Sequence, residues 1–141
     1  FALIIFDFYP GSYATAIYTP EPRPVDLWLA DQPGSGAVVQ MPFAESIDQS
    51  QIYYSLFHNK PFTGGFFNAN QPVQYRDISP ILDQFPDQDS VALLKELKVE
   101  YVVVDNAAYD DMSTLNQQLL SLGLIQLTDL EGQSVYTFST P

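Results

Sequence analysis

Tyr101-Val102-Val103-Val104 is a continuous apolar run, and such a run is typical of a strand that is buried on both faces of a sheet. A predicted helix precedes it, with a cap at Asp89 or Ser90. A second predicted helix follows it, with a cap at Asp110 or Asp111. Apolar residues recur at helical spacing in both, at Val91, Leu94 and Leu97 and at Met112, Leu115, Leu119 and Leu122. The order helix, strand, helix indicates an α/β fold.

Turn residues divide the rest of the chain into further elements. Short apolar runs predict strands, at residues 2–8, 37–41, 124–130 and 133–139, the last two joined by a Glu131-Gly132 turn. Helices are expected after Pro24, over residues 46–59 and, as a short turn, over residues 79–85. We therefore predict a single three-layer α/β domain over residues 1–141, with a mainly parallel open sheet of about five strands and a C-terminal antiparallel hairpin. It is Rossmann-like without the nucleotide fingerprint, since no Gly-x-Gly-x-x-Gly pattern occurs.

Composition excludes several classes of function. Apolar residues make up 46% of the 141 residues and charged residues only 16%, which is the balance of a folded chain. The net charge of −12 repels phosphate backbones, so no nucleic-acid partner is expected, and solubility is the plainest reason for the acidity. The absence of cysteine excludes zinc-thiolate sites, thiol catalysis and disulfides. No motif for a cofactor is present.

The numbered chain begins at Phe1 without a methionine. Residues 1–8 are apolar but far shorter than the ~20 residues that a membrane helix needs, and they lack the basic start of a signal peptide. We expect a piece excised from a longer protein, with targeting and membrane segments upstream.

Carboxylates follow the predicted strands at the edge where an open parallel sheet binds ligands, at Asp7, Glu45 and Asp105. Together with His58, the only histidine, they offer ligands for a divalent cation or groups for acid and base catalysis. Polar residues also end strands simply because the chain turns there, and this explanation is favoured. We therefore assign no metal ligand and no catalytic residue.

Residues 58–67 collect the scarce residue types of the chain. His58 and Lys60 are the only cations between Arg23 and Arg76, and Gly64-Gly65 would let backbone amides approach an anion closely. Phe66 adds an aromatic face for a sugar or a bilayer interface. A sugar phosphate or lipid phosphate is the ligand this pattern suggests, whereas a structural role for the histidine and the glycines is the favoured alternative.

Four pieces of sequence carry a family resemblance through their order. They are Trp28-Leu29-Ala30, Gly36-Ala37-Val38-Val39-Gln40-Met41-Pro42, Tyr53-Tyr54-Ser55-Leu56-Phe57-His58-Asn59-Lys60-Pro61-Phe62-Thr63-Gly64-Gly65 and Tyr101-Val102-Val103-Val104. The series resembles the tail of bacterial polytopic membrane glycosyltransferases of the C-type fold, which are related to the dolichyl-phosphate-mannose mannosyltransferases. The resemblance spans residues 25–138, and its most specific part is the His-x-Lys-Pro-x-x-Gly-Gly loop.

The resemblance implies that a parent protein transfers a sugar from a polyprenyl-phosphate donor outside the membrane, with its catalytic carboxylate in an early loop that this chain lacks. This chain would be a noncatalytic extracytoplasmic domain attached to the parent's own transmembrane segments, helping to hold a sugar or lipid-linked sugar phosphate. Asp7 stands where the resemblance leads us to expect a glutamate. Two alternatives remain: a docking platform for the transmembrane part, and a metal-dependent site among Asp7, Glu45 and Asp105.

Overall fold

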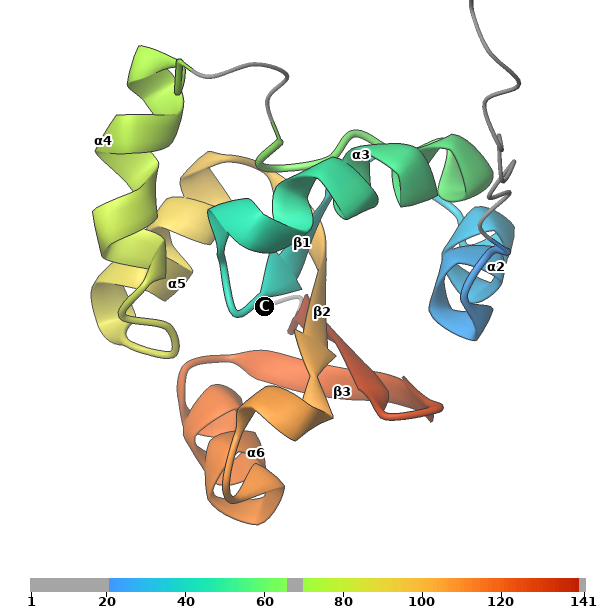
Figure 1. Cartoon of the computed structure of the whole chain (residues 1–141). Helices are drawn as coiled ribbons and strands as arrows, with labels where there is room; N and C mark the ends of the chain where they lie inside the picture. The colour runs from blue at the N-terminus through green and yellow to red at the C-terminus, as the bar shows by residue number, and fades with distance from the viewer. Residues whose placement is uncertain (1–20, 66–69, 140–141) are drawn as a thin grey trace, which may run out of the picture.

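The computed structural model describes residues 21–65 and 70–139, so the predicted strand at residues 2–8 lies outside the described residues. Figure 1 shows helices grouped around a small sheet. In chain order the elements are α2 (Pro24–Asp31), β1 (Ala37–Met41), α3 (Glu45–His58), α4 (Val73–Leu82), α5 (Gln88–Glu96), β2 (Val99–Asp105), a short 3-10 helix (Asn106–Ala108), α6 (Met112–Ser121), β3 (Leu124–Leu130) and β4 (Gln133–Phe138).

The described strands form one sheet in the order β1-β2-β4-β3. β1 runs parallel to β2, whereas β4 is antiparallel to both β2 and β3. The predicted α/β class and the C-terminal hairpin are confirmed. The sheet of the described residues is mixed, with four strands and one parallel pair, so the expected mainly parallel sheet of five strands is not seen there. The hairpin forms one end of the sheet: β4 pairs directly with β2, and β3 is the edge strand.

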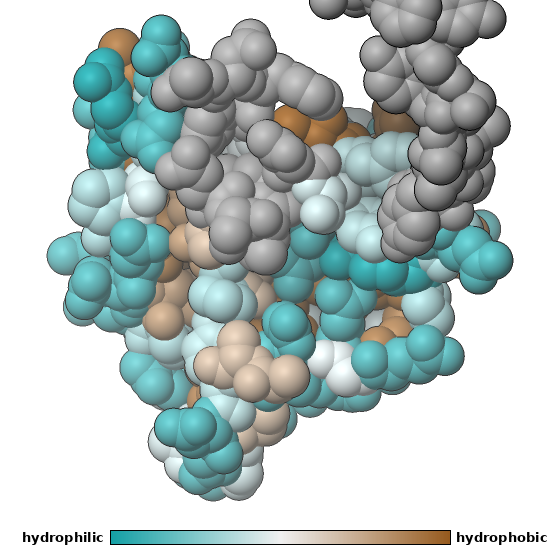
Figure 2. Space-filling model, in the orientation of Figure 1, coloured by the Kyte–Doolittle hydropathy of each residue, from teal (hydrophilic) through white to brown (hydrophobic). Residues whose placement is uncertain are grey.

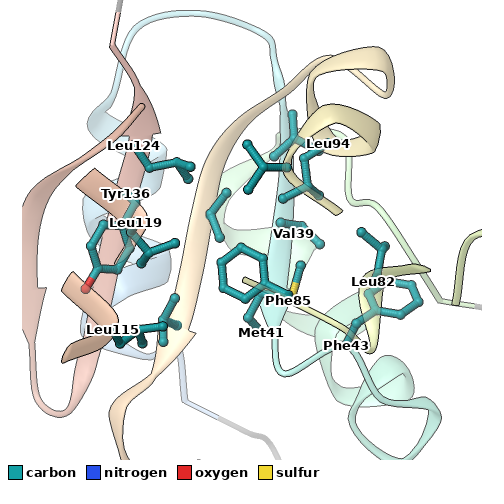
Figure 3. Close-up of a cluster of buried hydrophobic side chains, with 14 of the residues drawn as sticks. Val39, Met41, Phe43, Leu82, Phe85, Leu94, Leu115, Leu119, Leu124 and Tyr136 are labelled. Carbon is teal, nitrogen blue, oxygen red and sulfur yellow. The ribbon is translucent and has the colours of Figure 1, made fainter. Parts of the chain in front are cut away.

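β2 is buried on both faces, as its valine run predicts. Val102 and Val104 pack into the larger hydrophobic cluster, with residues of α4, α5 and α6. Tyr101 and Val103 pack into a second cluster with Val25 and other residues of α2. Within the larger cluster, Figure 3 shows side chains of α6 and the hairpin to the left of β2, and side chains of β1, α4 and α5 to its right. Because α4, α5 and α6 contribute to the larger cluster and α2 contributes to the second, helices cover both faces of the sheet.

Two helix boundaries differ from the prediction. α4 begins at Val73 and continues through Pro80, whereas only a short turn over residues 79–85 was expected. The helix is longer because it buries Tyr75 and Leu82 against the core, and this packing outweighs the proline. α5 is capped by Asp87 rather than by Asp89 or Ser90: the Asp87 Oδ1 accepts from the Ser90 N–H at 2.7 Å.

The other predicted boundaries of the second half are confirmed. Asp111 caps α6 by accepting from the N–H groups of Ser113 and Thr114. Glu131 and Gly132 both have positive φ, at 49° and 84°, which is the geometry of the two-residue turn that joins twisted antiparallel strands.

Candidate functional site

The segment from His58 to Gly65 runs along the outer edge of β1. Phe62 pairs with Val38 as a parallel bridge. The Val38 N–H donates to the Pro61 carbonyl at 2.7 Å, and the Thr63 N–H donates to the Val38 carbonyl at 2.7 Å. The loop that the sequence marks as a ligand site therefore continues the sheet through its backbone.

Lys60 directs its side chain into the protein. Only 7% of the residue is exposed. Its Nζ donates to the carbonyls of Gln32 and Gly34, at 2.9 and 3.0 Å, and lies 5.3 Å from the centre of the Tyr101 ring. The ammonium group thus binds the connection between α2 and β1, residues 32–36, and its positive charge faces carbonyl dipoles and an aromatic ring.

Two residues of β2 also hold this connection. The Gly36 N–H donates to Glu100 Oε2 at 2.9 Å, and the Tyr101 hydroxyl donates to the Pro33 carbonyl at 2.9 Å. A side chain on Gly36 would meet the Glu100 Cβ at 2.3 Å, so the close approach requires glycine there. Together with Lys60, these groups fix residues 32–36 against the sheet.

His58 is also enclosed, with 5% of the residue exposed. Its Nδ1 accepts from the Lys60 backbone N–H at 3.1 Å. Burial lowers the pKa of the imidazole below its ordinary value of 6.5; the charge of Asp26 opposes this, and the charges of Arg23 and Lys60 add to it. The ring is therefore neutral at pH 7, with its proton on Nε2, and it closes the turn that ends α3.

A second polar cluster, which we call the Arg23 cluster, joins α2, β1 and α3. Asp26 is fully buried, and its two carboxylate oxygens accept from Arg23 Nε and Nη2 at 2.8 and 2.7 Å. Arg23 also donates to the side-chain oxygens of Gln40 and Gln51, at 3.4 and 3.1 Å, and stacks 4.0 Å from the Tyr54 ring centre. One guanidinium thus satisfies polar groups from all three elements.

The sequence interpretation missed the Arg23 cluster. A usable signal was present, because an acidic residue three positions after a helix start often bonds the first backbone N–H. Asp26 accepts in this way from the Arg23 N–H at 3.0 Å. The contacts to Gln40 and Gln51, which lie 17 and 28 positions away, have no local signal.

The predicted site residues are not brought together. Lys60 contacts residues just before β1, whereas Asp105 lies at the opposite end of the parallel pair, where its Oδ1 accepts from the Ala107 N–H. Glu45 is the first residue of α3, and Asp7 and Phe66 lie outside the described residues. Within residues 21–65 and 70–139, no three acidic or histidine side chains are grouped so that they could hold a metal ion.

Two hollows lie near the predicted residues. Gly64 and Gly65 line a small one of about 140 Å³, with Tyr75 and other residues of α4. Arg23, Asp105 and Glu131 line a larger one of about 330 Å³ beside the turn of the hairpin. Neither His58 nor Lys60 lines these two hollows. The ligand-binding role of these two residues stays a prediction, and their contacts favour the structural alternative.

Comparisons with known proteins add no relative: no family model, no curated protein and no solved structure matches this chain. In the part of the chain that the structure describes, no helix has the length and apolar character needed to cross a bilayer.

Asp26→Asn should lower the free energy of unfolding by about 3 kcal/mol, because it leaves the Arg23 charge without its buried counter-charge. Asp31→Asn, at an exposed position of the same helix, should change it by less than about 0.5 kcal/mol. Urea denaturation of both variants measures the difference. Equal effects would show that the Arg23–Asp26 pair does not hold α2 in place.

Stability should fall as the pH drops from 7 to 5. The folded pKa of His58 lies below the unfolded one, so between the two values the unfolded chain binds more protons and is favoured. In His58→Gln this part of the pH dependence should disappear, as seen by denaturation at several pH values. The same slope in both proteins, or a ring that titrates by NMR at or above pH 6.5, would contradict burial of a neutral ring.

Proposed function

We propose that this chain is a noncatalytic domain that serves as a docking platform for the transmembrane part of a glycosyltransferase-like membrane protein, on the extracytoplasmic side. The family resemblance supports the parent. Support for the platform comes from one observation: the side chains of His58 and Lys60 in the His-x-Lys-Pro-x-x-Gly-Gly loop turn inward, with His58 bonded to the backbone and Lys60 bonded to the connection 32–36.

The contacts of Lys60 argue against a direct role in binding sugar phosphates. To reach a ligand, its ammonium group would have to leave two carbonyl acceptors and the Tyr101 ring. A hydrogen bond from a charged donor contributes about 1.5–3 kcal/mol, and a ligand would have to offset the loss of both bonds before any affinity appears. The loop is better explained as the element that fixes α3 and the connection 32–36 to β1.

Exposed apolar side chains on α2 and α3 offer a surface for docking. Leu27 of α2 is 53% exposed and Leu56 of α3 is 68% exposed, although the two helices pack together. Figure 2 shows apolar atoms at the surface beside α3, on a face that is otherwise largely hydrophilic. Apolar residues at such positions are suited to contact with another apolar segment.

The alternative function is weak binding of a sugar or lipid-linked sugar phosphate at Gly64 and Gly65. The hollow that these glycines line favours it, because backbone amides are accessible there and Tyr75 forms part of the wall. Its volume of about 140 Å³ is below the ~300–1,000 Å³ of ordinary small-molecule sites. The hollow is therefore too small to enclose a sugar phosphate.

NMR titration of the chain with a hexose 1-phosphate, with inorganic phosphate as the control, separates the two functions. The platform predicts no saturable shift in the amides of residues 58–65 at millimolar ligand. A saturable shift for the sugar phosphate alone would replace the platform with the ligand-binding function. The proposed attachment to a membrane protein is tested separately, by the sequence encoded upstream of Phe1. We expect apolar segments of ~20 residues there.

A further inference from the structure

β3 is an edge strand with little protection. It pairs with β4 on one side, and no described residue pairs with its other side. Its seven residues include no lysine, arginine or proline, the residue types that usually guard an exposed edge. Alternate N–H and C=O groups along such an edge are available to a further strand.

Apolar side chains flank this edge. Ile125 and Leu127 are 40% and 43% exposed. Gln126 and Thr128 pair with consecutive residues of β4, so Leu127 sits at a bulge without a partner on β4. On α6, Leu120 is 64% exposed.

Leu124 and Gln126 pair with Phe138 and Tyr136, which belong to the cluster that α6 covers. Side chains alternate along a strand, so Ile125 lies on the face of the sheet that is opposite to α6 and Leu120. Ile125 and Leu127 are therefore the exposed apolar residues of the edge strand itself.

The charged residues of β3 and its turn are acidic. Asp129 and Glu131 are exposed at the end of β3 and in the turn. No lysine or arginine occurs from residue 99 to the end of the sequence. Lys95 of α5 lies 5.3 Å from the ring centre of Phe138, which pairs with Leu124, so this cation is at the other end of β3 from the acidic turn.

We propose that the outer edge of β3 binds an extended segment of another protein, with alternating apolar and basic side chains, as an additional strand of the sheet. Main-chain hydrogen bonds along β3 provide affinity, as in other cases of strand addition. Apolar side chains of the segment cover Ile125 and Leu127, and its basic side chains meet Asp129 and Glu131. A second copy of this chain is a poorer occupant, because each copy brings a charge of −12 and the same acidic turn.

The probe is an acetylated peptide of about ten residues that alternates valine and lysine, long enough to span β3. It is titrated into the whole chain and followed by amide NMR. We expect saturable shifts and slower hydrogen exchange in residues 124–130. Leu127→Lys should weaken binding at least about tenfold, because it adds a like charge at the contact and removes an apolar surface. Ile81→Lys on α4, at a residue that is 38% exposed, should leave binding unchanged.

Three results would overturn the proposal. A peptide of the same charge with proline in place of valine lacks the main-chain N–H at every second residue and cannot pair as a regular strand, so equal binding of that peptide would mean simple charge attraction. Equal weakening by Leu127→Lys and Ile81→Lys would mean nonspecific association. A dimer in sedimentation that Leu127→Lys dissociates would show that a second copy occupies the edge.

Discussion

The fold depends on a half-buried positive charge, that of Arg23, which is paired with a fully buried carboxylate. The Arg23 guanidinium neutralises the buried Asp26 carboxylate and also donates to Gln40 of β1 and Gln51 of α3. Burying a carboxylate is costly unless it is paired and fully hydrogen-bonded, so these elements have to be placed together. Gln51 of α3 supplies a further acceptor for Arg23, so the same guanidinium group links α2 to α3.

Lys60 acts in the same way at the amino end of β1. Its ammonium group and the Glu100 carboxylate both bind the connection 32–36, while the backbone of residues 61–63 pairs with Val38. The His-x-Lys-Pro-x-x-Gly-Gly loop is therefore integrated into the sheet through both its backbone and its side chains. Arg23 and Lys60 are used in contacts within the protein, whereas the other three cations, Arg76, Lys95 and Lys98, are exposed.

The sequence predicted those features that depend on local patterns. The valines of β2, the limits of β1, the hairpin turn at Glu131 and Gly132 and the cap at Asp111 are all set by neighbouring residues, and the structure confirms them. Burial of Tyr75 and Leu82 extends α4 across Pro80, which a local pattern could not reveal. The candidate site was harder to predict, because the inward direction of Lys60 depends on acceptors 26 and 28 positions earlier in the chain.

Two of the five cations, Arg23 and Lys60, are thus used in contacts within the molecule. Its surface is acidic and in places apolar, which is consistent with a domain that binds other protein segments. The most direct measurement of this account is solvent exchange of the Lys60 ammonium protons, observed by NMR near neutral pH. Protection from exchange, together with through-bond coupling to the Gln32 and Gly34 carbonyl carbons, is the predicted result. Ammonium protons that exchange as fast as those of the exposed Lys95 and Lys98 would contradict it.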